Sequence, residues 1–313
     1  MSIQFADLAR RVAEDGQVTA EELFSLRQLG WGDGKIYREE AEAIFQINDT
    51  IQDRTDEWVD FFVEAIGEFV LNGTEPRNMC SEDEARWLIG CIDHDGKIES
   101  MAELEALVRI IERAENVPEF LKSYVLRQIE QEVMTGVGPT RCGGELSAAH
   151  ISAAECRILR RVIFASGGYG PAAVTRFDAE LLFRLKDATL QDENSPLWDE
   201  LFVDGVANYL KGFQLQNAQL DHARVKELQS FVADNEVRVG RFMAEMAREA
   251  PNFRRNLVWA FGKKPAGVNY AEVAAAGNLV DDFEQVWLEK MVDADGEVDD
   301  LERALLSRMI EEG

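Results

Sequence analysis

Two short stretches of the chain carry carboxylates at a spacing that could bind a divalent cation. Their sequences are CIDHDGKIES, from Cys91 to Ser100, and MVDADGEVDD, from Met291 to Asp300. Calcium takes six to eight oxygen ligands, and an EF-hand loop supplies them from alternate positions around a central glycine and from a glutamate at the twelfth position. The first chemistry to consider is therefore the binding of Ca²⁺ or Mg²⁺.

The C-terminal stretch fits this template better than the other. Its first position, usually an aspartate, is Met291, so one carboxylate of the ligand shell is missing. We expect Ca²⁺ or Mg²⁺ to bind there weakly, because fewer anionic ligands lower the affinity of such a loop. The acidic residues at the third, fifth, ninth and twelfth positions are Asp293, Asp295, Asp299 and Glu302.

The stretch around residue 95 is a second, weaker candidate for a metal site. It offers Asp93, Asp95 and Glu99, but Cys91 stands at the first position and Ala102 at the twelfth. An Asp-Gly turn also joins two helices without any metal, because aspartate caps a helix and glycine permits a tight turn. The sequence leaves both interpretations open and predicts that the C-terminal stretch binds metal before this one.

A metal-dependent enzyme is the alternative function for the same residues. The sequence has no P-loop and no nucleophile next to a base, which are the usual signs of catalytic chemistry. We therefore expect a protein that acts by binding. The enzyme alternative would use Asp93, His94 and Asp95, or Asp293, Asp295 and Glu302.

The acidic stretches belong to a pattern that recurs along the chain. IYREEAEAIFQIND, at 36–49, is matched by VTRFDAELLFRLKD, at 174–187, and the apolar residues in these segments fall three and four apart. That spacing is typical of one face of an α-helix, and recurrence of a helical unit predicts a repeat architecture. We predict an all-α fold of tandem helical repeats, with four related helix-loop-helix units in two domains.

The glycine- and proline-rich stretch GVGPTRCGG, Gly136–Gly144, indicates the boundary between the two domains. Residues 1–141 would hold units one and two, and residues 142–313 would hold units three and four, with a helical insertion at about 213–280. The third helix of a unit carries aromatic residues at helical spacing, which we interpret as repeated core. They are Trp58, Phe61, Phe62 and Phe69 in the first unit and Trp198, Phe202 and Tyr209 in the third.

The turn VDADGEVDDLERALL, at 292–306, resembles the TerB-like helical proteins, which are associated with tellurite resistance and acidic metal sites. The resemblance covers the first two helices of each unit. It implies an all-α fold and a role in divalent-metal binding or stress signalling. The residues that match its acidic turn are Asp293, Asp295, Asp299 and Glu302, together with Asp93, Asp95 and Glu99.

The composition limits the class of partner. With 59 acidic and 33 basic residues the formal net charge is −26, which disfavours nucleic acids and anionic lipid surfaces. No segment reaches the roughly 18 uncharged residues of a membrane span, so we expect no membrane insertion. Four cysteines without a metal-binding spacing are ordinary in a reducing compartment, and we expect a cytoplasmic protein.

The predicted insertion reverses the charge of the chain. Between His222 and Lys264 nine basic residues face five acidic ones. These charges could neutralise the acidic repeats within the same molecule, or they could form a docking face, because arginine with aromatic residues is typical of interface anchors. We predict a non-catalytic adaptor or sensor with metal binding as a regulator. Its protein partner would bind through Arg254, Arg255, Trp259 and Phe261.

Overall fold

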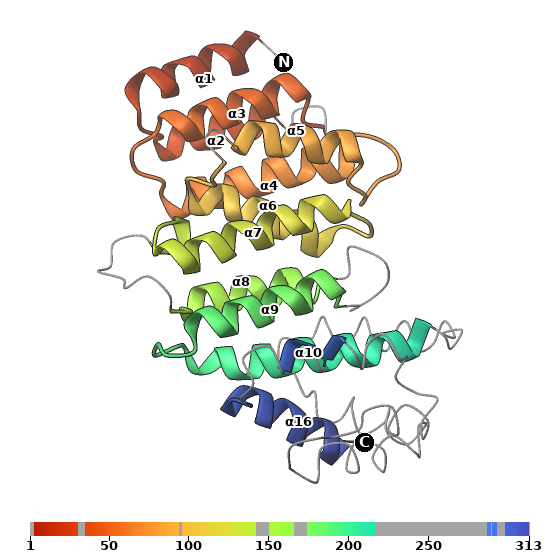
Figure 1. The fold of residues 1–313 in the computed structure, drawn as a ribbon. Helices are drawn as coiled ribbons and strands as arrows, with labels where there is room; N and C mark the ends of the chain where they lie inside the picture. The colour runs from red at the N-terminus through yellow and green to blue at the C-terminus, as the bar shows by residue number, and fades with distance from the viewer. Residues whose placement is uncertain are drawn as a thin grey trace. The chain divides into compact units, whose positions relative to one another are not determined.

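The computed structural model describes residues 3–30, 35–93, 96–141, 150–165, 174–216, 287–288, 290–292 and 298–312. In these ranges the regular structure is helical and no strand is present (Figure 1). A single isolated bridge, between Met79 and Asn116, is the sole β-type pairing of the described residues. The prediction of an all-α fold is confirmed.

The chain divides into two compact units. One holds residues 1–149 and 157–170, and the other holds residues 150–156 and 171–313, so helix α8 (Ala153–Ile163) contributes to both. The predicted domain boundary, after residue 141, adjoins residues that are not described and stays a prediction. The first unit contains α1 (Ile3–Asp15), α2 (Ala20–Gly30), α3 (Arg38–Thr50), α4 (Asp56–Asn72), α5 (Glu82–Ile92), α6 (Met101–Arg113), α7 (Glu119–Thr135) and the 3₁₀ turn η1 (Pro139–Arg141).

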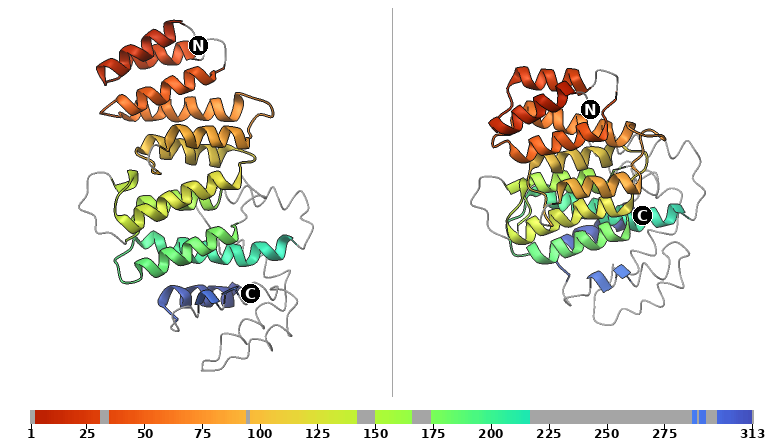
Figure 2. Two further views of the ribbon diagram at one scale, coloured as in Figure 1. Left: turned by 45° about the horizontal axis from the view of Figure 1, so that its top comes forward. Right: turned by 90° about the horizontal axis from the view of Figure 1, so that it is seen from above.

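Helices of the first unit lie side by side in layers (Figures 1 and 2). Helix α1 packs on α2 and α3, and α4 packs on α6 and α3. The aromatic stripe of α4 enters this core: Trp58, Phe61 and Phe62 are buried, and Phe45 of α3 meets Phe62 edge to face at 5.1 Å. Phe69 is only partly buried. The prediction that the stripe forms core is confirmed for the three buried residues.

The second unit is built around α10 (Pro196–Gln216), which packs on α9 (Arg176–Thr189) and α16 (Asp300–Glu312). Trp198, Phe202 and Tyr209 are buried along α10, as predicted. Helix α10 begins at Pro196, after Ser195, and Pro suits the first helical position because it has no N–H to satisfy. It continues to Gln216, past the predicted start of the insertion, and the rest of the insertion to residue 280 lies outside the described residues.

Among the described residues, no helix is long and apolar enough to span a bilayer.

Candidate metal centre at the acidic turns

Several of the described helices begin with an acidic residue that stands three positions after the N-cap. In α6 the side chain of Glu103 accepts hydrogen bonds from the N–H of Ser100, and Ser100 Oγ accepts one from the N–H of Glu103. This reciprocal pair is a capping box, which satisfies two backbone donors that a helix start would otherwise leave unpaired. The same box begins other helices: Thr19 with Glu22, Ser81 with Glu84, Ser152 with Glu155, Thr175 with Asp178, and Asp299 with Glu302.

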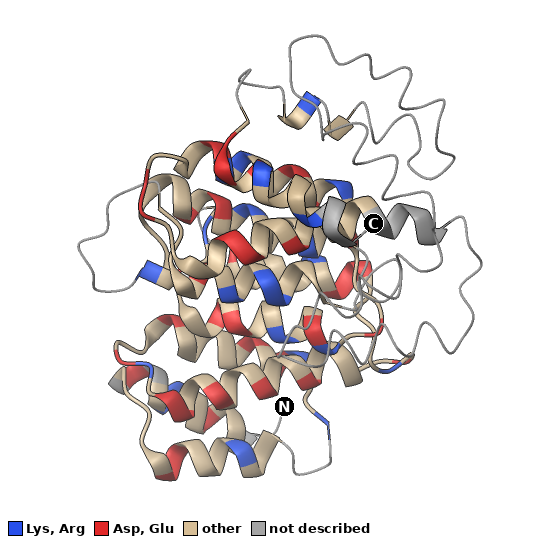
Figure 3. Cartoon of the chain, turned by 90° about the horizontal axis from the view of Figure 1, so that it is seen from below, with Lys and Arg blue, Asp and Glu red and all other residues tan. Residues whose placement is uncertain are grey.

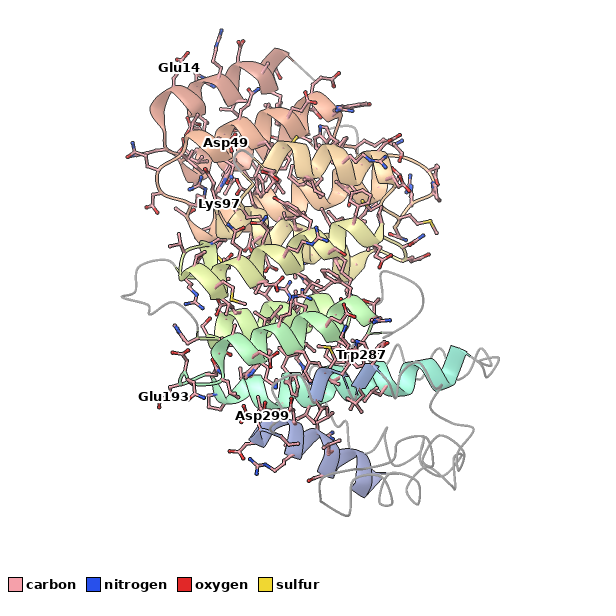
Figure 4. The ribbon with its side chains drawn as sticks, viewed as in Figure 1. Glu14, Asp49, Lys97, Glu193, Trp287 and Asp299 are labelled. Atoms are coloured by element: carbon pink, nitrogen blue, oxygen red, sulfur yellow. The ribbon has the colours of Figure 1, made fainter. Side chains whose placement is uncertain are left out.

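Two predicted ligands of the C-terminal turn, Asp299 and Glu302, lie at the start of α16, where Figure 4 labels Asp299. Asp299 is the N-cap, and Glu302 is the acid of its capping box. Both carboxylates also contact the ammonium of Lys186 in α9: Nζ lies 2.5 Å from Asp299 Oδ2 and 2.6 Å from Glu302 Oε1. The side chains of Lys186 and Glu302 are each 1% exposed, so this ion pair is buried.

Burial and charge act in opposite directions on this ion pair. Burial raises the pKa of the Glu302 carboxyl above its ordinary value, by more than its hydrogen bond from Lys186 lowers it. Burial lowers the pKa of Lys186, but hydrogen bonds to Asp299, Glu302 and Asp187 outweigh it and raise the pKa above its ordinary value. The lysine therefore stays charged and offsets one of the two carboxylate charges at the start of α16.

The buried ammonium of Lys186 disfavours the binding of a metal ion at Asp299 and Glu302. A divalent cation ligated by Asp299 and Glu302 would lie beside a buried ammonium, and like charges at that distance repel strongly. Asp299 and Glu302, the two predicted ligands that the structure describes, do not fit a metal site while the ammonium of Lys186 contacts them. Asp293 and Asp295, the other half, lie outside the described residues.

The turn in the first unit is held by the protein's own groups. Asp93 Oδ1 accepts a hydrogen bond from the N–H of Gly96, whose φ of 77° lies in the left-handed region that favours glycine. Gln128 of α7 donates to the carbonyl of Gly96 and accepts from the N–H of Ile98. Burial and the nearby charge of Asp93 raise the pKa of Tyr124. These contacts are those of a structural helix-to-helix turn.

Of the other predicted residues of that turn, Glu99 lies within the described residues. Glu99 is exposed, although its N–H donates to Glu103. Asp95 and His94 lie outside the described residues. Among the described residues, no group of three or more His, Cys, Asp and Glu side chains is arranged to hold a metal ion. Metal binding at either turn, and the enzyme alternative that depends on it, stay predictions.

Behind the turn, Glu103 contacts a residue that corresponds to Lys186. Glu103 Oε1 accepts a hydrogen bond from Asn48 Nδ2 at 2.9 Å, and both side chains are buried. Asn48 stands in IFQIND where Lys186 stands in LFRLKD. Each half therefore joins the acid of one helix start to the same position of an earlier helix, through an amide in one case and an ammonium in the other.

The difference between asparagine in the first unit and lysine in the second affects the hydrogen bonding of a nearby tryptophan. Asn48 Oδ1 accepts a hydrogen bond from Trp58 Nε1 at 3.2 Å. Lys186 has no acceptor atom to offer, and Trp198 Nε1, on the helix that carries the matching aromatic stripe, is buried without a hydrogen-bond partner. Lysine thus provides a charge for Glu302 and leaves an indole donor unsatisfied.

A second set of contacts matches between the two units. Trp87 Nε1 donates to Glu42 at 3.3 Å, and its ring meets those of Phe45 and Phe69 at 5.9 and 4.7 Å. In the other unit a buried tryptophan makes the same kinds of contact: its Nε1 donates a hydrogen bond to a glutamate at 3.2 Å, and its ring meets two aromatic rings at 5.8 and 4.8 Å. That tryptophan is Trp287, which Figure 4 labels, and its partners are Glu180, Phe183 and Tyr209.

Sequence reasoning missed Asn48 and Lys186. The signal was available, because each is a polar residue inside a stretch whose other positions follow the apolar period of a buried helix face. A polar residue at such a position needs a buried partner. The predicted partner-binding residues, Arg254, Arg255, Trp259 and Phe261, lie outside the described residues.

Comparison of the chain with protein-family models, with curated proteins and with solved structures gives no match in any of the three.

Proposed function

We propose that the protein is a non-catalytic helical adaptor or sensor, built from tandem repeats, whose partner contacts are added to the repeat. The observation that carries this proposal is the matched packing of two tryptophans at unequal distances along the chain. Trp87 bonds to a glutamate 45 residues away, whereas Trp287 makes the corresponding bond across 107 residues. The same tryptophan packing thus occurs in the first unit, where the intervening chain is short, and in the second unit, where the predicted insertion lengthens it.

The added residues are therefore not required for the helical packing. They include the basic and aromatic stretch NFRRNLVWAFGKKPAG, at 252–267, which has no acidic residue in a chain of net charge −26. Arginine and large aromatic residues dominate the binding energy of protein interfaces. A segment of this composition that the repeat does not need is suited to binding a protein partner through Arg254, Arg255, Trp259 and Phe261.

Metal regulation is the second element of the proposal, and the acidic turns support it in a restricted form. Since the ammonium of Lys186 already contacts Asp299 and Glu302, a Ca²⁺ or Mg²⁺ ion at the C-terminal turn would depend on Asp293 and Asp295. Calorimetry should show weak binding, with Kd on the order of a millimolar. Asp295→Ala should abolish it, and Asp95→Ala should leave it. No heat of binding at a saturating calcium concentration would remove metal from the proposal.

The adaptor function is tested by removing the added residues. Replacing residues 217–286 with a short Gly-Ser linker should leave the helical circular dichroism of the first unit and abolish every partner identified by mass spectrometry after co-purification. Arg254→Glu with Arg255→Glu should lower the salt concentration at which partners dissociate. Lys97→Glu with Lys290→Glu is the matched control, because it changes net charge equally at two exposed described positions. Partners that survive both insertion variants would contradict the proposal.

A further inference from the structure

The division between the two compact units falls inside helix α8. Residues 150–156 belong to the second unit, and the residues from Arg157 onward, to Gly170, belong to the first. In an α-helix each carbonyl accepts a hydrogen bond from the N–H four residues later. The carbonyls of residues 153–156 therefore accept from residues 157–160, which are assigned to the other unit. The start of α8 loses these bonds if its end is released.

The short length of α8 makes this dependence strong. The helix has 11 residues, and isolated helices shorter than about 12–15 residues are marginal in water because the first turn is costly to form. Neither half of α8 is long enough to be helical alone. Tertiary contacts must therefore hold the helix at both of its ends.

The end of α8 is held to α6 by Arg161. Its guanidinium donates two hydrogen bonds to Glu112, at 2.8 and 2.7 Å, and two to Glu105, at 2.6 and 2.7 Å. Bidentate pairs of arginine with carboxylate are the strong and geometrically specific form of ion pair. The Arg161 side chain is 28% exposed, so water screens these pairs in part. Lys122 of α7 also holds this end, because its Nζ donates to the carbonyl of Ile163 at 3.2 Å.

The ion pairs of Arg161 differ from pairs that lie within one helix. Acidic and basic positions are interspersed along the described helices (Figure 3). Pairs such as Arg38 with Glu42 join residues four apart, which supports a single helix. Arg161 instead binds two carboxylates of another helix, 49 and 56 residues away in the sequence. Its loss would weaken the attachment of α8 to α6.

The segment that leads into α8 is held to the connection between α9 and α10. The N–H of Ile151 donates to Asn194 Oδ1 at 2.8 Å, and the N–H of Ser195 donates to the carbonyl of Ile151 at 2.8 Å. Asn194 Nδ2 also donates to the carbonyl of Thr189, the last residue of α9, at 3.0 Å. Ile151 is completely buried. Its backbone therefore holds together the end of α9 and the start of α10.

A capping box joins this segment to the first turn of α8. The N–H of Ser152 donates to the carboxylate of Glu155, and the N–H of Glu155 donates to Ser152 Oγ. Such a box forms only while the first turn is helical, because helical geometry brings the two residues together. Unwinding of that turn therefore removes the support of the preceding residue, Ile151.

We propose that α8 is a coupling element, which makes the connection between α9 and α10 in the second unit depend on the attachment of α8 to α6 in the first. Release of Arg161 from Glu105 and Glu112 unwinds α8, and the unwinding frees the connection. Binding of a partner that separates α8 from α6 would loosen the second unit by this route. The inference goes beyond the proposed adaptor function and depends on neither the metal nor the insertion.

Hydrogen exchange of the full chain, followed by mass spectrometry, tests the coupling. In Arg161→Gln, peptides from α8 and peptides covering 189–198 should both exchange about tenfold faster than in the parent, as expected for the loss of two partly exposed charge pairs. Arg157→Gln is the matched control, because Arg157 is an exposed arginine of the same helix. It should change neither rate by more than about twofold. Peptides from α1 and α3 should exchange as in the parent.

Two further variants keep the test decisive if Arg161→Gln does not fold, which circular dichroism would show. Glu112→Gln removes one of the two carboxylate partners and should accelerate exchange of both sets of peptides about threefold. Asn194→Ala releases the segment before α8 instead. Because coupling between two sites is reciprocal, it should also accelerate exchange in residues 157–163.

Three results would overturn the inference. The first is acceleration in α8 with residues 189–198 still at the parent rate, in Arg161→Gln or Glu112→Gln, because the halves of α8 would then open independently. The second is no acceleration of residues 157–163 in Asn194→Ala, or of α8 itself in the arginine variant. The third is equal acceleration in α1 and α3, which would mean that the whole chain unfolds together.

Discussion

Replacing Lys186 with methionine should strongly destabilise the second unit. Methionine keeps the length of the side chain and removes its charge. Glu302 and Asp299 would then remain as two carboxylates at the start of α16 with no cation between them. Removing one partner of a buried ion pair costs about 3–5 kcal/mol, because the remaining charge is left uncompensated.

The distances between the charged atoms predict a similar loss of stability. The two carboxylate oxygens lie 2.5 and 2.6 Å from the same nitrogen, so they are no more than about 5 Å apart. At an effective dielectric constant of about 20, two unit charges at that distance repel by about 3 kcal/mol. Lys186→Asn should cost less than Lys186→Met, because an amide can donate to Glu302 and accept from Trp198 Nε1, and each such hydrogen bond is worth about 1 kcal/mol.

Hydrogen exchange with mass spectrometry is the appropriate assay, since two units need not unfold together. Peptides from α9, α10 and α16 should lose protection by about 3 kcal/mol in Lys186→Met. Peptides from α4 and α6 should not change. Lys97→Met, at an exposed lysine of the first unit, is the control. If α16 keeps its protection to within about 0.5 kcal/mol, the ion pair does not hold it and the reasoning is refuted.

Two further predictions concern titratable groups of the first unit. Burial raises the pKa of Glu103, so its contribution to stability is fully present below the unfolded pKa of about 4.3 and is lost as pH rises through the higher folded pKa. The melting temperature of Glu103→Gln relative to the parent should therefore increase between about pH 4 and pH 7, and a difference independent of pH would contradict this. Burial raises the pKa of Cys80 to about 12 and that of Cys91 to about 11. Iodoacetamide at about pH 8 should label Cys91 roughly 200-fold more slowly than a free thiol, and labelling of the folded chain at the unfolded rate would contradict the assignment.

The fold class was predictable because the signal is local. Apolar residues three and four apart define helix faces over a whole segment, and a serine three residues before a glutamate defines a helix start. The box of Ser81 and Glu84 follows this rule. The burial of Trp58 and Trp198 follows from the same periodicity. None of these inferences requires knowledge of which helices meet.

The roles of the turn acids were less predictable because they depend on distant residues. On the EF-hand template Glu302 is the twelfth residue, and Glu103 comes one residue too late to match it. In the structure the two are equivalent, because each stands three residues after its N-cap, Asp299 or Ser100. The reference point of the pattern is the helix start and not the glycine of the turn.

A metal site and a helix cap therefore look alike in sequence for a physical reason. Both need a carboxylate close to a tight turn, where it can accept bonds from backbone N–H groups or ligate a cation. What separates them is the group that faces the carboxylate from another helix. Glu302 meets Lys186, which lies 116 residues earlier, and Glu103 meets Asn48, which lies 55 residues earlier. An ammonium neutralises the acid and competes with any metal, whereas an amide leaves the negative charge in place. The C-terminal helix start has two carboxylates and one ammonium, so it keeps one negative charge, but a cation already contacts both of its carboxylates, whereas Glu103 meets a neutral amide.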